Sequence, residues 1–282
     1  MPATPTYARR RIGNELRKLR RQQGLSLDMV SDAIDWNKSK LSRIETAKMP
    51  ISRHDLHLIA SMYSIDRDAL ARLEDWIRQD TGGRRWWNEY ADLITSAYEE
   101  FISLEAHAAG ISTAHSSLIP GLLQSEGYAR AVITCGPFVP DPDTADALTE
   151  IRMKRQEIIT SRAAVKVSAV ITESVLHNEY GGRNVMQAQL RHLLDMTRLS
   201  NVDLRLIQHA SMQGVLVGAF TILTFPDARD PNMVFIEHQG GIVSKDSDRD
   251  VKRYRRYLDH LSTAAMNQTG TRELIAKRLD ES

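Results

Sequence analysis

Hydrophobic residues in the first eighty positions recur every three or four residues, which is the spacing of short amphipathic helices. In the first of these helices Ile12, Leu16 and Leu19 share one face, and Gly24 ends the segment. The next three segments each follow a residue that favours a helix N-cap: Ser26, Asn37 and Ser52. A fifth helix is expected from about Asp66 to Arg78. This region is therefore predicted to be an all-α five-helix domain.

The pattern changes after Gly82-Gly83, a pair that disfavours helix and that we predict to be the hinge between two domains. A long helix is expected from Trp86 to about Ala109. Beyond it, alternating or continuously apolar segments predict strands at 111–116, 165–172, 202–207, 219–225 and 233–238. Helical patterns fill the intervals, at 125–134, 144–161, 185–199, 248–261 and 271–279. The second domain is thus predicted to be α+β with a mostly antiparallel sheet.

The second and third helices, separated by a tight turn, have the arrangement of a helix-turn-helix motif. In the third helix, Lys38–Thr46, Leu41 and Ile44 share the face expected to pack on the second helix. Ser39 and Arg43 lie roughly opposite with Thr46, and Lys38, Lys40 and Ser42 flank them. A polar, cationic surface of this kind can enter the major groove of DNA without repulsion from phosphates.

The distribution of charge supports a polyanionic partner for the first domain. The chain carries a net charge of +1, but residues 1–53 hold twelve Lys or Arg against five Asp or Glu, a net +7 that leaves −6 for the rest. The alternative is that these cations form an ordinary solvated surface without a polyanionic partner. Helix order, turn length and caps all agree with a helix-turn-helix domain, which argues against this alternative. We expect residues 1–11 to be a disordered basic arm, 12–80 the helix-turn-helix domain and 81–282 a regulatory and dimerisation domain.

The segments Leu16–Arg20, Gly24–Ser26 and especially Lys40–Glu45 resemble the repressor-type five-helix domains of the XRE family. The resemblance implies that Lys38 and Ser39 meet base edges, that Arg43 pairs with a guanine, and that Asn37 and Lys48 grip phosphates. It also implies a structural ion pair between Arg20 and Glu45. The predicted DNA-binding residues are Asn37, Lys38, Ser39, Lys40, Ser42, Arg43 and Lys48.

A second resemblance covers the C-terminal part. Its segments are Leu118–Val132, Arg152–Gln156, Glu173–Leu176, Met186–Leu190 and Gly218–Leu223. They are similar to the C-terminal domain of WhiJ-like regulators of streptomycetes and other actinobacteria. The resemblance implies a transcription regulator, in some cases antitoxin-like, whose gene often neighbours one for a small acidic protein. The C-terminal domain is then expected to bind that small partner protein, and a pocket for a small-molecule effector is the alternative.

One recognition helix covers too few base pairs for specific binding in a genome, so a homodimer on an inverted repeat is expected. An aromatic cluster of Trp86, Trp87 and Tyr90 is either part of the core or an anchor at an interface between domains or subunits.

The remaining residues give no strong indication of chemistry. His54 and His57 lack a third metal ligand at a recognised spacing, and Glu173 has no catalytic partner nearby in the sequence. We expect no metal, no cofactor and no enzymatic activity. The single cysteine, Cys135, permits no intrachain disulfide and is expected to be a small buried residue. No apolar run is long enough to span a membrane, so we expect a cytoplasmic, nucleoid-associated protein.

Overall fold

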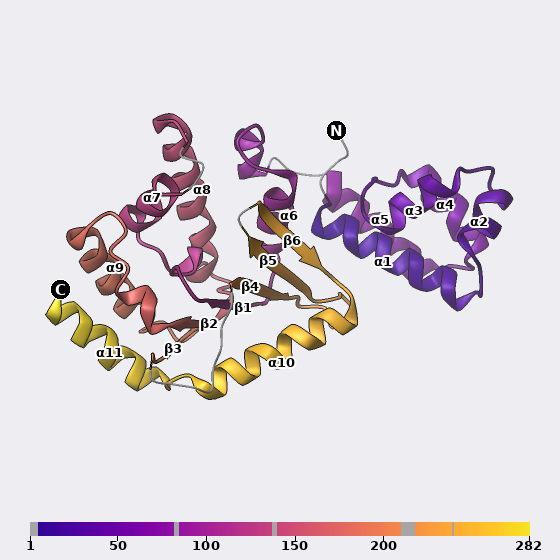
Figure 1. Ribbon diagram of the computed structural model, residues 1–282. Helices are drawn as coiled ribbons and strands as arrows, with labels where there is room; N and C mark the ends of the chain where they lie inside the picture. Colours follow the sequence, from indigo (N-terminus) through magenta and orange to yellow (C-terminus); the bar gives the residue numbers. More distant parts are fainter. Residues whose placement is uncertain (1–4, 82–84, 137–139, 210–217, 239) are drawn as a thin grey trace. The chain divides into compact units, whose positions relative to one another are not determined.

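The computed structural model describes residues 5–81, 85–136, 140–209, 218–238 and 240–282 (Figure 1). The chain forms two compact units. One comprises the chain up to Ala91 together with Glu99–Leu104, and the other comprises Asp92–Tyr98 together with Glu105–Ser282. The boundary therefore falls after Ala91 instead of after residue 80. The expected hinge at residues 82–83 lies outside the described residues.

The first unit contains the five helices that the hydrophobic pattern predicts. They are α1 (Tyr7–Gln22), α2 (Leu27–Ala33), α3 (Lys38–Glu45), α4 (Arg53–Met62) and α5 (Arg67–Thr81). The three predicted N-caps are confirmed, because the side chains of Ser26, Asn37 and Ser52 each accept a hydrogen bond from a backbone N–H of the first turn. Local sequence therefore determines where these helices begin.

Apolar side chains from all five helices meet in one core. Its fully buried members include Leu16 of α1, Val30 of α2, Leu41 of α3, Leu56 of α4 and Leu73 of α5. Burying a side chain of this size contributes about 1.5–3 kcal/mol. Each short helix is thus stabilised by the shared core and not by its own propensity.

The expectation of a disordered basic arm is wrong for residues 7–11, which form the first turns of α1. Thr6 caps the helix, and three arginines that would have formed the arm are held inside the first unit. Arg9 binds Asp80, with Nη2 2.9 Å from Oδ2, and Arg10 binds Glu100. The guanidinium of Arg11 lies 4.1 Å from the centroid of the Trp76 ring. Their carboxylate and aromatic partners lie about 65 to 90 residues away, so local sequence could not reveal them.

The long helix expected from Trp86 to Ala109 is also wrong. The structure has a short 3₁₀ helix, η1 (Trp86–Tyr90), and then a separate helix, α6 (Ser96–Glu105). The interruption has a local cause, because the Thr95 hydroxyl accepts a hydrogen bond from the N–H of Tyr98 and so starts a new helix.

The second unit is built on a six-stranded sheet with the order β3-β2-β1-β4-β5-β6. The strands are β1 (Gly110–His115), β2 (Lys166–Thr172), β3 (Val202–Ile207), β4 (Ala219–Thr224), β5 (Met233–His238) and β6 (Gly241–Lys245). Pairings β1–β4, β4–β5 and β5–β6 are antiparallel, and β1–β2 and β2–β3 are parallel, so the predicted mostly antiparallel sheet is confirmed. Strand β6 is not predicted by the sequence pattern, because none of its residues is buried and it carries no apolar face.

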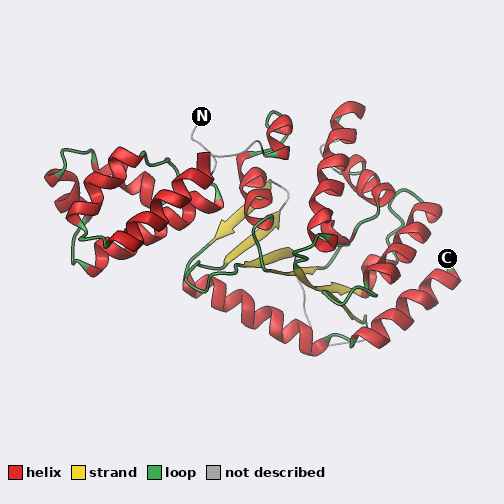
Figure 2. Cartoon of the chain, turned by 180° about the vertical axis from the view of Figure 1, so that it is seen from behind, coloured by secondary structure: helices red, strands yellow, loops and turns green. Residues whose placement is uncertain are grey.

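Helices cover both faces of this sheet (Figures 1 and 2). Helix α10 (Asp248–Ala264) crosses one face, while α7 (Glu126–Thr134), α8 (Pro142–Thr160) and α9 (Arg183–Met196) lie on the other. The remaining elements are α11 (Gln268–Glu281) and the 3₁₀ turns η2 (Gly121–Leu123) and η3 (Glu173–Leu176).

A buried ion pair ties α8 to the end of α6. Arg155 donates to both carboxylate oxygens of Glu105, at 2.7 and 2.8 Å, and to the Tyr98 hydroxyl at 2.6 Å. Burial lowers the pKa of Arg155, but attraction to Glu105 outweighs it and leaves that pKa raised. Arg155 therefore stays charged within the second unit.

Three further predictions concern Cys135, Glu173 and membrane-spanning helices. Cys135 is exposed at the end of α7, so the expectation of a buried residue is wrong. Glu173 accepts a hydrogen bond from the backbone N–H of His209 at 2.9 Å. Within the described ranges, no helix is long and apolar enough to cross a membrane.

Candidate nucleic-acid interface

Helices α2 and α3 form the predicted helix-turn-helix geometry. Asp35 adopts a positive φ of 52° in the turn, and the N–H of Trp36 donates to the carbonyl of Ser31 at 2.8 Å. Leu41 and Ile44 are buried in the core of the first unit, as the helical wheel predicts. The opposite face of α3, with Ser39, Arg43 and Thr46, is exposed. The helix is thus anchored by one side and presents the other to solvent.

A buried ion pair fixes the back of α3. Arg20 of α1 donates from Nε and Nη2 to the two carboxylate oxygens of Glu45, at 2.6 and 2.8 Å, and both side chains are buried. These hydrogen bonds to the Glu45 carboxylate raise the pKa of Arg20, although burial lowers it. Arg17 adds a hydrogen bond to the Glu45 carbonyl at 3.0 Å. The ion pair implied by the family resemblance is therefore confirmed, and it positions α3 from the buried side of the helix.

Gly13 of α1, which the apolar pattern does not single out, allows α1 and α3 to approach closely. A Cβ atom at this position would lie 2.7 Å from the carbonyl oxygen of Ile44 and 2.9 Å from that of Glu45. These distances are too short for a methyl group, so α1 can contact the last turn of α3 only through a glycine. A glycine inside a helix costs about 1 kcal/mol relative to alanine, and this cost is the signal that could have identified the contact.

Arg43 and Lys48 are the most available cations of the predicted set. Both side chains are exposed, and among the described residues neither forms an ion pair or a side-chain hydrogen bond. Lys38 is paired with Asp28 at 2.8 Å, but both side chains are more than half exposed. A surface pair of this kind contributes only about 0–1 kcal/mol, so a phosphate can replace Asp28 at little cost.

The remaining predicted residues have structural tasks. Lys40 is half-buried, with Nζ 3.7 Å from the centroid of the Trp36 ring and 3.2 Å from Oδ1 of Asp55. It therefore links α3 to the turn before it and to α4. The side-chain oxygen of Asn37 accepts the Ser39 N–H as the cap of α3, and Ser42 is half-buried. The predicted residues whose side chains are exposed and available to a ligand are therefore Lys38, Ser39, Arg43 and Lys48.

Arg53 is a further exposed cation, outside the predicted set of DNA-binding residues. It is the first residue of α4, directly after the N-cap Ser52, and it has no side-chain partner in the described chain. The start of a helix carries a partial positive charge and unpaired N–H groups, which favour phosphate. A basic residue that directly follows a predicted N-cap is the signal that could have identified it.

The aromatic cluster proposed as an interface anchor lies in the first unit. Trp87 and Tyr90 are buried within the chain, and the Trp86 ring packs edge-on against them with centroids 5.5 and 6.3 Å apart. This placement favours the core alternative.

His57 contacts Glu74 at 2.9 Å, and among the described residues no group of three or more His, Cys, Asp or Glu side chains could hold a metal ion.

Comparison with known protein families gives two matches. Residues 98–277 match the family described as a domain of unknown function, DUF5753. Residues 11–73, which include most of α1 and all of α2–α4, match a helix-turn-helix domain. No curated protein and no solved structure matches the chain.

Proposed function

Because this chain belongs to the DUF5753 family and carries a helix-turn-helix domain, we propose that it is a sequence-specific DNA-binding transcriptional regulator. The observation that carries the proposal is the outer face of α3. It is exposed and cationic, its inner face is buried, and Glu45, the one carboxylate of the helix, is held by Arg20 on the protein side. The proposal places the protein in the cytoplasm, at the nucleoid.

In the proposed mechanism the basic helix-turn-helix region is first attracted to phosphates, and α3 then enters the major groove. Lys38, Ser39 and Arg43 read base edges, with Arg43 able to bind a guanine through two hydrogen bonds. Lys48, in the segment between α3 and α4, and Arg53, at the start of α4, contact phosphates. These contacts position the helix, whereas the base contacts supply specificity.

We propose that two copies bind an inverted repeat, since one helix of this length contacts only a few base pairs. The second unit would supply the dimer contacts and receive the regulatory signal. The WhiJ-like, antitoxin-like assignment and a small acidic partner protein encoded nearby are part of this proposal and rest on the resembling segments of the second unit.

A small-molecule effector is the second candidate for the regulatory signal, and two observations favour it. Binding of a protein partner usually needs a contiguous apolar patch. In the described chain only four large hydrophobic side chains are exposed: Met29, Leu58, Leu93 and Val243. The second unit also contains a pocket of about 380 Å³, within the usual range for ligand sites.

Substitution of Arg43 tests the proposal. Arg43→Ala is expected to relax base preference at one position of the operator and to weaken specific binding by about 1–3 kcal/mol. Lys48→Ala is the matched control, because loss of a phosphate contact weakens binding to all sequences. It also lowers the salt slope, which is the slope of the logarithm of the binding constant against the logarithm of the salt concentration, by about one charge. Binding-site selection and titrations at several salt concentrations measure both effects. Unchanged base preference in Arg43→Ala would remove Arg43 from the reading residues.

A further inference from the structure

Helix α10 carries a dense group of unpaired cations, although the chain beyond residue 53 is acidic overall. Its exposed basic side chains are Arg249, Lys252, Arg253, Arg255 and Arg256. None of these five forms an ion pair or a side-chain hydrogen bond within the described residues. Like charges on one helix repel each other, and together they create a local positive potential. This surface therefore attracts anions.

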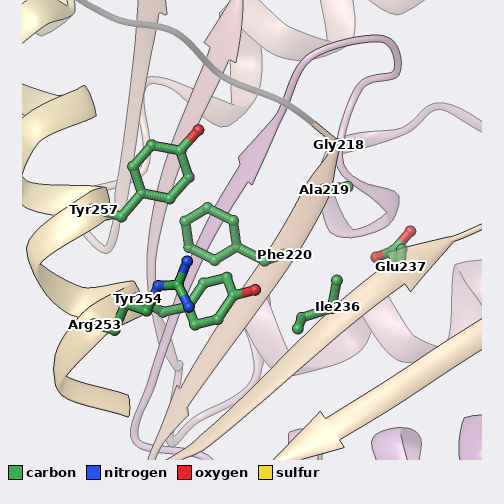
Figure 3. A pocket seen from close by; sticks show the side chains of 8 residues that line it. All are labelled: Gly218, Ala219, Phe220, Ile236, Glu237, Arg253, Tyr254 and Tyr257. Atoms are coloured by element: carbon green, nitrogen blue, oxygen red, sulfur yellow. The ribbon is translucent and has the colours of Figure 1, made fainter. Parts of the chain in front are cut away.

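A pocket lies between this helix and the sheet (Figure 3). Val251, Leu258 and Leu261 of α10 pack on the apolar face of the sheet, and Tyr254 and Tyr257 lie beside them over Phe220 of β4. The Phe220 ring packs edge-on against Tyr254, with centroids 5.0 Å apart, and is stacked with Tyr257 at 5.5 Å. These three rings form an aromatic wall.

Arg253 is the cation that belongs to both the basic helix and the pocket. It lines the pocket together with Phe220 and Tyr254, and Figure 3 draws its guanidinium group in front of the Tyr254 ring. A guanidinium group can stack on an aromatic face while its N–H groups bind a carboxylate or a phosphate through two hydrogen bonds. With no protein partner in the described chain, Arg253 keeps all five donors for a ligand or for water.

Among the described residues that line the pocket, Glu237 is the one acidic residue. It follows Ile236 in β5, and neighbouring residues of a strand point to opposite faces of the sheet. In Figure 3 its carboxylate accordingly points away from the three rings. Helix α10 also carries Asp248, Asp250 and Asp259, so its five basic and three acidic residues leave a net charge of 5 − 3 = +2. The field of the helix at the aromatic wall is therefore positive, and a cationic ligand is disfavoured.

We propose that this pocket binds a small planar aromatic molecule that carries an anionic group, either a carboxylate or a phosphate. The flat body lies against Phe220, Tyr254 and Tyr257, and the anionic group pairs with Arg253. The volume of about 380 Å³ suits a small ligand with one or two fused rings. The inference deepens the small-molecule alternative proposed above, but ligand binding itself does not depend on DNA binding.

Two pairs of probes test this inference on the full-length chain. Indole-3-carboxylate is compared with neutral indole-3-carboxamide, and adenosine 5′-monophosphate with adenosine, by calorimetry and ligand-observed NMR. At least one anion is expected to bind about ten-fold more tightly than its uncharged counterpart, which is the effect of a charge-assisted hydrogen bond. The preferred pair distinguishes a carboxylate ligand from a phosphate ligand. Failure of both anions to bind at millimolar concentration would overturn the inference.

Two neighbouring arginines separate specific binding from attraction by net charge. Arg253→Gln is expected to weaken binding of the preferred anion about ten-fold, whereas Arg255→Gln removes the same charge outside the pocket and should change affinity less than about two-fold. Tyr254→Leu should weaken binding of both members of the preferred pair, because it removes part of the aromatic wall. Equal effects of the two arginine substitutions would contradict the inference. Thermal melts verify that each variant is folded.

Operator binding is measured separately, with and without the preferred probe. A probe that binds in the Arg253-dependent manner but leaves operator affinity unchanged supports the pocket and contradicts the sensing role. Loss of operator selectivity in Arg43→Ala concerns the first unit alone and has no bearing on the pocket. Failure of the ligand inference and failure of the proposed function are thus distinguishable.

Discussion

At the scale of single residues, a few buried contacts on the protein side of α3 determine what its outer side can do. Arg20 holds the only carboxylate of the helix, so the exposed face lacks an acidic group that would repel phosphates. Gly13 lets α1 approach the end of α3. Neither residue is expected to touch DNA, and both should nevertheless affect binding through the position of α3.

Gly13→Ala is expected to destabilise the protein by about 1–3 kcal/mol and to weaken operator binding. The added methyl group would lie 2.7 Å from the Ile44 carbonyl oxygen, so α1 and α3 must move apart. Chemical denaturation and operator titration measure the two effects. Gly127→Ala in α7 is the control, because its Cβ would lie 3.6 Å from Val185 and alanine favours the helix. An equally stable Gly13→Ala variant would show that the contact is not tight.

His115, at the end of β1, makes stability dependent on pH. Burial lowers its pKa below the ordinary value of 6.5, Arg152 lowers it further, and Glu237 opposes them. The unfolded chain therefore binds a proton on His115 more tightly than the folded chain does. The contribution of neutral His115 to the free energy of unfolding is complete above pH 6.5 and is lost as the pH falls from 6.5 through the lowered pKa of the folded state.

We expect the free energy of unfolding to fall between pH 7.5 and 5.5, with a contribution from His115 of at most about 1.4 kcal/mol per pH unit. His115→Gln should make this decline shallower, and His192, whose pKa burial also lowers, would account for part of the remainder. Exposed His54 supplies the control variant His54→Gln. Urea denaturation at several pH values measures the slope, and an identical slope in His115→Gln would refute the assignment.

At the scale of secondary-structure elements, the N-terminal turn of α1 has a structural task, whereas the sequence predicts a disordered basic arm there. Arg9, Arg10 and Arg11 contact Asp80, Glu100 and Trp76 within the first unit. Helix α3 differs, because Arg43 has no such partner in the described chain. Two basic segments of similar composition therefore have different roles, which depend on the residues that surround them.

Arg9→Gln tests this difference. Asp80 would lose its closest cation in a nearly buried position, with only Arg85, 3.7 Å away, as partial compensation. We expect a loss of roughly 3 kcal/mol in stability. The salt dependence of DNA binding should not change, in contrast to Lys48→Ala. A salt slope reduced by about one charge would instead show that Arg9 reaches a phosphate.

At the scale of the whole molecule, the chain combines a basic helical unit with an acidic α+β unit. The first unit holds every residue proposed to contact DNA, and the second holds the pocket beside α10. Dimerisation is proposed to depend on the second unit, so the two units should contribute differently to operator affinity.

A fragment of residues 1–104 contains the whole first unit and is expected to bind a single half-site like the full chain. It should bind a two-half-site operator more weakly than the full chain, because it lacks the proposed dimer contacts. Electrophoretic titrations on both DNA lengths measure this. Equal affinity of fragment and full chain for the two-half-site operator would refute dimerisation through the second unit.

The sequence alone predicts most of the elements and the candidate recognition helix, because these depend on local patterns. Helical periodicity and the N-caps Ser26, Asn37 and Ser52 act within a few residues, so they can be recognised without knowing the fold. The predictions for residues 7–11 and 86–109 are wrong because a cap at Thr6 or Thr95 sets a helix boundary that the apolar pattern does not show.

Only the tertiary structure decided which charged groups are available and where a pocket forms. Lys40 and Arg43 look equivalent in the sequence, yet Lys40 meets Trp36 and Asp55 whereas Arg43 stays exposed. Phe220 and the tyrosines of α10 form one wall although more than thirty residues separate them. The physical reason is that a side chain's partner is set by packing between distant segments, and the spacing of residues along the chain carries no information about that packing.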